Sequence, residues 1–336
     1  MCKGPVQLSA KPSIDKYGDK KIAVLIPCCN EEATIKKVIN DFQQQLPMAA
    51  IYVYDNNSSD NTFDIATAEG AIVVREKRQG KGFVVASMFE DIEADIYVLV
   101  DGDDTYPADS VHELILPIIE ERADMVVGTR LTAFSDQSFR PFHIFGNRLV
   151  AKLVNMIFKS KLTDTMSGYR AFNMDFIRKI PVISRGFEVE TQMTLQALYY
   201  DFVIIEVPVS YRERPEGSYS KLNTFSDGMK LILKIFDIFK AYRPLLFFSI
   251  IGVVLAVTGL LIGSVPVIEF VETGKIPHFP SAILASGIII ISVIFIGIGI
   301  ILDSINHRLR ELMLIIRSTR WSKNKNQELK PRGPNG

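Results

Sequence analysis

The chain is poor in cysteine and carries no net charge, and both absences exclude classes of protein. Its three cysteines, two of them adjacent at Cys28 and Cys29, form neither a disulfide framework nor a spaced set of metal ligands. Basic and acidic residues each number 38, so charge gives no sign of a nucleic-acid partner, and we expect none. A Walker A loop is missing, and no Gly-X-Gly-X-X-Gly follows the first predicted strand, which disfavours a kinase or a dinucleotide dehydrogenase.

The start of the chain lacks an apolar core of the length that a signal peptide needs. Residues 1–20 are polar and include glycine, proline and lysine. We therefore expect a flexible N-terminal tail that begins in the cytoplasm.

Ionisable side chains are also absent from two long segments near the other end, Pro244 to Ile268 and Phe279 to Leu302. At about 1.5 Å per residue, each helix would exceed the roughly 30 Å hydrocarbon core of a bilayer. The pattern predicts a two-helix transmembrane hairpin over residues 244–303, with a buried pair of soluble helices as the alternative. Glycines that permit close helix contact are Gly252, Gly259, Gly263, Gly287, Gly297 and Gly299.

Basic residues flank this hairpin at both outer ends, whereas the linker from Glu269 to His278 is short and holds acidic residues as well as Lys275. The positive-inside bias therefore places both termini in the cytoplasm. We expect a multi-pass protein of the cell (inner) membrane, with residues 304–336 as a basic cytoplasmic tail. The flanking basic residues are Lys230, Lys234, Lys240, Arg243, Arg308, Arg310, Arg317, Arg320, Lys323 and Lys325.

Two further segments are predicted to lie as amphipathic helices in the headgroup plane. Residues 226–243 combine many apolar residues with lysines that recur on one side. Phe142 to Leu162 shows a similar mixture of apolar and basic residues. For both segments the alternative is a helix packed within a globular domain.

Residues 21–225 alternate strand patterns with helix patterns. Strands are predicted at Ile22–Ile26, Ile51–Tyr54, Ala71–Val74 and Ile96–Val100. Helices are predicted from Asn30 to about Gln45, from Thr62 to Glu69, and from Gly82 to Glu90. This order indicates an α/β domain with a mostly parallel sheet and helices on both faces. In such domains ligands bind beyond the carboxyl ends of the strands.

An acidic cluster, Asp101-Gly102-Asp103-Asp104, directly follows the last of these strands. Three carboxylates at one strand end repel one another, which raises their pKa values unless a cation is present. Divalent cations such as Mg²⁺ or Mn²⁺ take oxygen ligands of this kind and bring phosphate-bearing substrates with them. A solvated acidic turn is the alternative.

Two other polar sets, Pro27 to Glu31 and Asp55 to Asp60, also lie at predicted strand ends. Because the ends of parallel strands meet at one edge of a sheet, we expect all three sets to share one crevice. That crevice suits a nucleoside diphosphate, with Asp55 accepting from the ribose or the base. Lys77, Arg78 and Lys81 would add positive charge, and we expect Lys81 to contact the nucleotide sugar.

Taken together, these residues resemble the family-two inverting glycosyltransferases with the nucleotide-sugar-binding GT-A fold, over about residues 20–225. The polyprenyl-phosphate branch, which includes dolichol-phosphate mannose synthases and bacterial polyprenyl-phosphate glucosyltransferases, is the most similar by pattern. The motifs that carry the resemblance are Ile26-Pro27-Cys28-Cys29-Asn30-Glu31, Asp55-Asn56-Asn57-Ser58-Ser59-Asp60-Asn61-Thr62, Gly80-Lys81-Gly82, Asp101-Gly102-Asp103, Asp164-Thr165-Met166-Ser167-Gly168-Tyr169-Arg170 and Arg214-Pro215-Glu216-Gly217-Ser218-Tyr219-Ser220-Lys221. The two trailing membrane helices match the bacterial members of that branch.

The resemblance implies roles on the donor side of the site. The residues it assigns to the nucleotide sugar, carried by UDP or GDP, are Pro27, Asn30, Glu31, Asp55, Asp101 and Gly102, with Arg214, Ser220 and Lys221 closing over the diphosphate as a loop. Asp101 and Asp103 would hold the Mg²⁺ or Mn²⁺. Because Thr105 stands where the family often has glutamine, Asp104 is the alternative third ligand.

The resemblance also implies an acceptor side. Arg130 would lie near the donor or acceptor phosphate, and Asp164 would be the acceptor-side carboxylate, with Glu188 and Glu190 as its rivals. Residues expected at the lipid phosphate are Arg148, Ser167 and Arg170. Arg170 has a structural ion pair as its alternative role, and Glu190 has a favourable position at a helix N-terminus.

The expected reaction moves a hexose-type sugar from a nucleotide sugar to a polyprenyl phosphate by a single displacement. Transfer to a lipid hydroxyl and a non-catalytic membrane scaffold are the alternatives. Processive polysaccharide synthesis is disfavoured, because two trailing spans are too few for a polymer channel. Relatives assemble through membrane helices, so a homo-oligomer stays open.

Overall fold

The computed structural model describes Tyr17 and residues 19–130, 141–182, 189–212, 236–237 and 239–328, without the side chains of 141–148, 310 and 313–328. The chain forms two compact units, residues 1–224 and 225–336. The first unit holds the sheet, and the second holds two long apolar helices.

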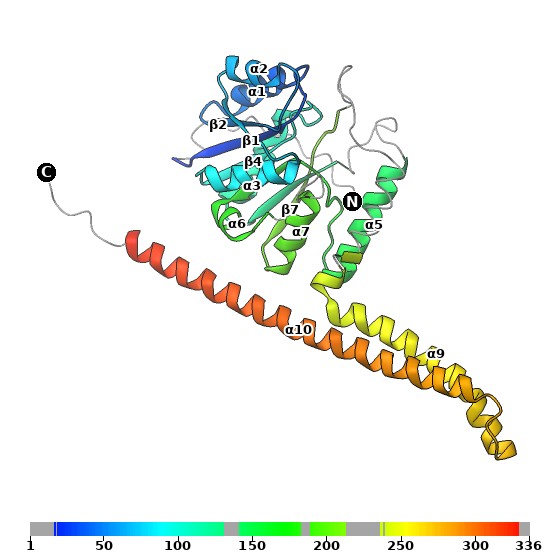
Figure 1. Ribbon diagram of the computed structural model, residues 1–336. Helices are drawn as coiled ribbons and strands as arrows, with labels where there is room; N and C mark the ends of the chain where they lie inside the picture. The colour runs from blue at the N-terminus through cyan, green and yellow to red at the C-terminus, as the bar shows by residue number, and fades with distance from the viewer. Residues whose placement is uncertain are drawn as a thin grey trace, which may run out of the picture. The chain divides into compact units, whose positions relative to one another are not determined.

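The first unit is built on a 7-stranded sheet with the order β3-β2-β1-β4-β6-β5-β7 (Figure 1). Its strands are β1 (Ile22–Cys28), β2 (Ala50–Asp55), β3 (Ile72–Arg75), β4 (Ile96–Leu99), β5 (Met125–Thr129), β6 (Arg170–Asn173) and β7 (Ile204–Pro208). β6 runs antiparallel to both of its neighbours, and the other pairs are parallel. The predicted mostly parallel sheet is therefore confirmed.

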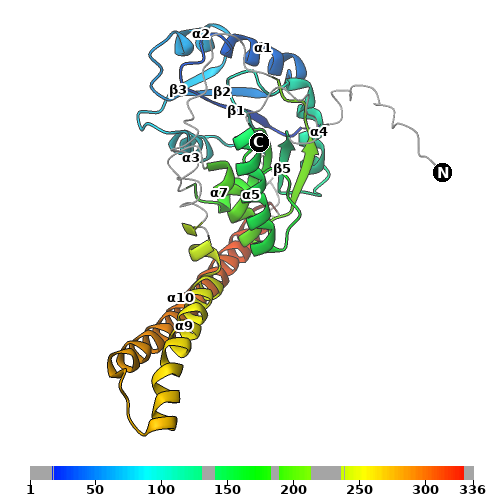
Figure 2. The ribbon, with the colours of Figure 1, turned by 90° about the vertical axis from the view of Figure 1, so that its right-hand side faces the viewer.

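Helices cover both faces of this sheet (Figure 2). α1 (Ile35–Gln45), α2 (Thr62–Ala68) and α4 (Val111–Ile119) lie on one face, and α3 (Lys81–Asp91), α6 (Met174–Lys179) and α7 (Val189–Tyr199) on the other. Alternate residues of β1 supply the two cores: Val24 belongs to the first and Leu25 to the second. Each such fully buried side chain contributes about 1.5–3 kcal/mol.

β1 extends two residues further than predicted and includes Pro27. Its ladder with β4 ends at Leu25 and Leu99, whereas its ladder with β2 continues to Cys28 and Asp55. Pro27 therefore lies where β1 has lost one neighbour, which is where a strand tolerates a residue without a backbone N–H.

Two predicted segments of the first unit are more ordered or more buried than expected. Tyr17, within the predicted tail, is buried, and its hydroxyl bonds to His112 on α4. The predicted interfacial segment Phe142 to Leu162 forms α5 (Pro141–Phe158), whose Val150 and Val154 are buried in this unit. The alternative of a packed helix thus holds for the face of α5 that carries Val150 and Val154. Met156 on the outer face is 65 % exposed, and contact of that face with lipid headgroups stays a prediction.

The second unit contains α9 (Pro244–Thr273) and α10 (Phe279–Glu328). Two spans, Pro244–Thr273 and Phe279–Leu309, are long and apolar enough to cross a bilayer. Only 11 % and 17 % of their most apolar windows are buried, unlike the core helices of a soluble protein. These exposed apolar surfaces associate the chain with a membrane.

Four of the six glycines that were expected to permit close helix contact lie at the contact between α9 and α10. A Cβ on Gly252 would lie 2.6 Å from Ile296 Cγ1, and Gly259, Gly263 and Gly299 face α9 or α10 atoms in the same way. The contact is also polar, because Ser292 Oγ donates to the Gly252 carbonyl at 2.8 Å. At Gly287 and Gly297, by contrast, an added Cβ would meet no atom within 4 Å.

The ends of the second unit differ from the predicted boundaries. α10 continues unbroken past residue 303 to Glu328, so much of the predicted basic tail is helical. Of the predicted interfacial helix, residues 226–235 lie outside the described residues, and 239–242 are helical. Its Phe239 ring meets Phe247 of α9 edge to face at 5.5 Å.

Candidate active site

The first two predicted polar sets meet beyond the carboxyl ends of β1 and β2. The Asn30 N–H donates to Ser58 Oγ at 2.9 Å, and Asn30 Oδ1 accepts from the Ser59 N–H at 2.7 Å. Glu31 N–H donates to Thr62 Oγ1 at 2.8 Å. Asn30 has φ 54, a left-handed conformation that asparagine adopts more readily than most residues.

The acidic cluster joins the same edge through the buried Cys28. A Cβ on Gly102 would lie 2.6 Å from Cys28 Sγ, so this position needs glycine. Burial, and after it the negative charges of Glu31, Asp55, Asp101 and Asp103, raise the pKa of Cys28. Carboxylates from three loops therefore act on one side chain, which agrees with the three polar sets lying at one edge of the sheet.

Asn56, which follows β2, holds the glycine-containing loop at this edge. Its Nδ2 donates to the carbonyls of Glu76 and Arg78, at 3.2 and 2.8 Å, and its Oδ1 accepts from the Gly80 N–H at 2.7 Å. Gly80 has φ 133, which favours glycine. The loop is thereby fixed so that α3 begins at Lys81.

Arg78, which was expected to add positive charge near the phosphates, pairs with Glu76 of its own loop while its side chain stays 58 % exposed. Its guanidinium donates twice to Glu76, at 3.0 and 2.9 Å, and lies over the Phe83 ring at 5.1 Å. The Arg78 hydrogen bond lowers the pKa of Glu76 to about 2. These contacts indicate that Arg78 shapes the loop.

Lys81 bridges two carboxylates that lie far apart in sequence. Its Nζ is 2.5 Å from Asp101 Oδ1 and 2.5 Å from Glu190 Oε1, at the start of α7. Burial lowers the pKa of Lys81, but Asp101 and Glu190 outweigh it and raise that pKa above its ordinary value. Lys81 thus brings the predicted Glu190 and Asp101 together as one charged group with an excess of negative charge.

The other two aspartates of the cluster have different surroundings. Asp103 is buried, and its Oδ1 accepts from the Thr105 N–H and hydroxyl at 3.2 and 2.6 Å. Asp104 Oδ1 accepts from Lys37 of α1 at 2.7 Å and lies 3.9 Å from Arg212. Asp104 is therefore engaged by cations of the chain itself, as Asp101 is by Lys81, and its role as a third metal ligand stays a prediction.

A divalent cation fits Asp101 and Asp103 by the chemistry of the donor set. In the described part of the chain, no three His, Cys, Asp or Glu side chains form a metal-holding group. Mg²⁺ in nucleotide sites is, however, commonly held by one or two carboxylates together with substrate phosphates. Asp101 retains 27 % exposure of its side chain, which leaves it accessible to such a cation.

We expect Gly168→Ala to lower the transfer rate by about tenfold with little loss of stability, because only a side-chain tip has to move. A Cβ on Gly168 would lie 2.4 Å from Asp101 Oδ2, so the carboxylate would have to turn away. Gly287→Ala, with open space around its Cβ, is the matched control. Transfer rates and thermal unfolding are measured for both variants. Equal transfer rates would contradict the placement of Asp101.

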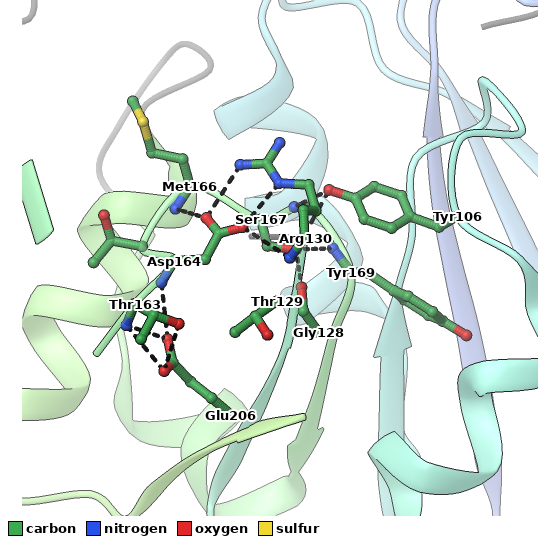
Figure 3. Close-up of polar contacts among 12 residues, drawn as sticks. Tyr106, Gly128, Thr129, Arg130, Thr163, Asp164, Met166, Ser167, Tyr169 and Glu206 are labelled. Carbon is green, nitrogen blue, oxygen red and sulfur yellow. Dashed lines mark hydrogen bonds and ion pairs between the residues drawn. The ribbon is translucent and has the colours of Figure 1, made fainter. Parts of the chain in front are cut away.

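The acceptor side centres on an ion pair between Arg130, which follows β5, and Asp164 (Figure 3). Arg130 Nε and Nη2 donate to the two Asp164 oxygens at 2.9 and 3.1 Å. Asp164 Oδ1 also accepts from the Met166 N–H at 3.0 Å, and its side chain is fully buried. Arg130 lies 5.7 Å from the Tyr211 ring centroid. Two predicted site residues are thus paired with each other.

Ser167 and Arg170 were predicted at the acceptor phosphate, but both are fully buried. Ser167 Oγ donates to the Gly128 carbonyl at 2.6 Å. Arg170 donates to the Ser167 and Thr165 carbonyls at 2.8 and 2.9 Å, and burial lowers its pKa to about 10. These contacts give Arg170 a structural role through carbonyl oxygens rather than through the ion pair expected as its alternative, and they give no support to a phosphate contact by either residue.

Other predicted site residues lie outside what the structure describes, and some described neighbours had no prediction. Outside are the side chain of Arg148 and residues Glu188, Arg214, Ser220 and Lys221. Unpredicted is Tyr106, whose hydroxyl oxygen accepts from the Gly168 N–H at 3.1 Å and lies 3.3 Å from Ser167 Oγ. Its one signal in the sequence is its place just after the acidic cluster.

Comparisons with known proteins agree with this geometry. The family model "Glycosyl transferase family 2" matches residues 23–181. "Glycosyltransferase AglJ" of Haloferax volcanii is 30 % identical over 87 % of this chain and 96 % of its own length. The "Dolichyl-phosphate hexose transferase" of the same organism is 28 % identical over 66 % of this chain and 96 % of its own length.

A solved structure shares the fold. Glucosyl-3-phosphoglycerate synthase from Mycobacterium tuberculosis, crystallised with Mn²⁺, UDP and glucosyl-3-phosphoglycerate, aligns with a TM-score of 0.54 at 20 % identity, over 68 % of this chain and 81 % of that one. Likeness at this identity shows a GT-A-like fold. The relative that matches almost end to end, together with the family model, shows more: this chain belongs to glycosyl transferase family 2 and is a glycosyltransferase.

Proposed function

We propose that this enzyme moves a hexose from a nucleoside diphosphate sugar, carried by UDP or GDP, to a polyprenyl phosphate at the inner membrane. The observation that carries the proposal is the position of Asp101. Its carboxylate adjoins Gly168 of the segment that holds Asp164, and shares Lys81 with Glu190. The donor-side carboxylate and the acceptor-side segment therefore lie next to each other, which supports a shared site.

On the donor side, Asp101 and Asp103 would hold a divalent cation, Mg²⁺ or Mn²⁺, which when bound neutralises charge on the departing diphosphate. The loops of Asn30 and Asp55 bind and orient the nucleotide. The Lys81 ammonium, held by Glu190 and Asp101, offsets part of the negative charge of these two carboxylates beside the same site.

On the acceptor side, Arg130 offers a positive group to the lipid phosphate. The Asp164 carboxylate accepts hydrogen bonds from Arg130 and from the Met166 N–H, so its proposed role is to orient the Arg130 guanidinium. A strong general base is unnecessary, because a phosphate monoester with a second pKa near 6 is already largely anionic at neutral pH. Orientation of the attacking oxygen then supplies the main effect.

The membrane helices follow from the acceptor. A polyprenyl chain stays in the bilayer, so the catalytic unit has to be tethered there, and α9 and α10 provide two spans for this. In the proposed topology both ends of the hairpin are cytoplasmic, since basic residues crowd them. The related dolichyl-phosphate hexose transferase supports the same acceptor class.

A direct assay tests the proposal. Full-length protein in detergent is incubated with radiolabelled UDP- or GDP-hexoses, Mg²⁺ or Mn²⁺, and either a polyprenyl phosphate or the matching polyprenol. We expect label to enter the organic phase when the acceptor is the polyprenyl phosphate and not when it is the polyprenol. Transfer to the polyprenol at the same rate would favour a lipid hydroxyl as acceptor, and no transfer with any donor would refute the proposal.

A further inference from the structure

Glu206, near the edge of the sheet, makes a set of contacts that the proposed mechanism has not used. It lies in the middle of β7, opposite Val127 of β5. Both of its carboxylate oxygens accept from the Thr163 N–H, at 2.8 and 2.9 Å, and they also accept from the Thr163 hydroxyl at 3.0 Å and the Asp164 N–H at 2.9 Å (Figure 3). One side chain thus holds two consecutive backbone N–H groups.

This tether fixes the residue from which the Asp164 side chain begins. Hydrogen bonds from N–H groups to a carboxylate are stronger than neutral ones, and two in succession define the orientation of the peptide planes. From that anchored backbone the Asp164 carboxylate reaches Arg130 with two bonds, at 2.9 and 3.1 Å. The orientation of the Arg130 guanidinium therefore depends on Glu206 through the backbone and side chain of Asp164.

We propose that Glu206 is a positioning residue for the acceptor half of the site. It acts through Asp164 on Arg130 and so sets the affinity for the acceptor phosphate, without contacting substrate itself. The inference rests on the proposed function, which assigns Arg130 to that phosphate. A purely structural tether, which would stabilise the sheet edge and nothing else, is the competing explanation.

Asp124 provides a matched control, because it tethers the same part of the sheet at its opposite end. Its Oδ2 accepts from the Val203 N–H at 2.8 Å and its Oδ1 from Asn173 Nδ2 at 2.8 Å. It precedes β5, whereas Arg130 follows β5, so the two positions are roughly 20 Å apart along the strand. A tether of similar kind is therefore present far from the acceptor side.

The kinetic test compares Glu206→Ala, Glu206→Gln and Asp124→Ala, with donor and acceptor varied separately. For Glu206→Ala we expect kcat/KM for the polyprenyl phosphate to fall about tenfold while KM for the nucleotide sugar changes by less than about twofold. Glu206→Gln should recover part of the loss, since its amide oxygen still accepts one N–H. Asp124→Ala should leave both kinetic constants unchanged. Equal losses for donor and acceptor, or the same pattern in Asp124→Ala, would overturn the proposal.

Two readouts keep this inference separate from the proposed function. Hydrogen exchange of the full chain in detergent should show faster exchange at the Thr163 and Asp164 amides in Glu206→Ala than in Asp124→Ala. Unchanged exchange would show that Glu206 does not hold these two amides. If the wild type transfers no hexose, the proposed function fails. The role of Glu206 can then still be tested by measuring the binding of a polyprenyl phosphate without donor. Binding that is weaker in Glu206→Ala alone supports the inference, and binding that is equal in all variants, or absent, ends it.

Discussion

Asp101→Asn is expected to lower the hexose transfer rate by about 100–1000-fold, the loss typical of removing one preorganised electrostatic stabiliser. The asparagine keeps the size of the side chain and an oxygen that can accept from Lys81, but it removes the negative charge that would hold the divalent cation. Because Asp101 is partly exposed at the end of β4, the change leaves no large cavity or unpaired buried group. The protein should therefore fold and lose turnover.

The matched control is Asp104→Asn in the same acidic cluster. Asp104 pairs with Lys37 on α1, and the proposed cation site uses Asp101 and Asp103, so replacing Asp104 should cost little activity. Transfer rates over a range of Mn²⁺ concentrations, together with Mn²⁺ binding followed by electron paramagnetic resonance in the presence of UDP or GDP, make the comparison. A wild-type rate in Asp101→Asn, or equal losses in both variants, would show that the metal carboxylate has been wrongly assigned.

Arg130→Met is expected to lower the free energy of unfolding by about 3–5 kcal/mol, the cost of leaving one partner of a buried ion pair alone. The Asp164 side chain is fully buried, and that of Arg130 is 15 % exposed. Removing the guanidinium leaves a buried carboxylate that keeps the Met166 N–H but loses two charged hydrogen bonds. Transfer should fall as well, because in the proposed function Arg130 is the positive partner of the acceptor phosphate.

A second substitution separates stability from function at this pair. Arg130→Met combined with Asp164→Leu removes both charges, and such replacements of buried ion pairs by apolar residues are often neutral or stabilising. We expect the double variant to recover most of the stability but none of the transfer. Urea unfolding of the full chain in detergent, followed by circular dichroism, and the transfer assay measure the two effects. Recovery of transfer in the double variant would exclude a direct role for Arg130.

Much of the sheet could be predicted from sequence, because three apolar runs end abruptly in polar residues. The runs before Cys28, Asp55 and Asp101 show this pattern, and each is a strand whose end lies at the site. β6 could not be found this way. It begins with the charged Arg170, spans four residues and runs against its neighbours, so neither an apolar run nor the alternation of strands with helices reveals it.

The site was predictable where its chemistry is local and not where it depends on distant pairing. The acidic cluster can be recognised within four residues of sequence. Lys81 and Glu190, by contrast, are 109 residues apart, and Glu206 is 42 residues from Asp164. Arg170 shows the opposite error: an arginine in a suggestive motif carries the right charge for a phosphate, but only the fold shows that protein carbonyls enclose it.

The place of β6 in the sheet has a consequence for the geometry of the reaction. Arg170 is paired with Leu99 on one side and with Val127 on the other, so one strand position fixes how far the chain that leads to Asp101 stands from the chain that leads to Arg130. A slip of one residue would change that alignment by about 3.3 Å, which is as long as the whole approach of an attacking oxygen to carbon. In the proposed function, the register of this strand therefore fixes the distance between the nucleophile and the leaving group. Insertions or deletions in this short strand should be far less tolerated than changes of its side chains.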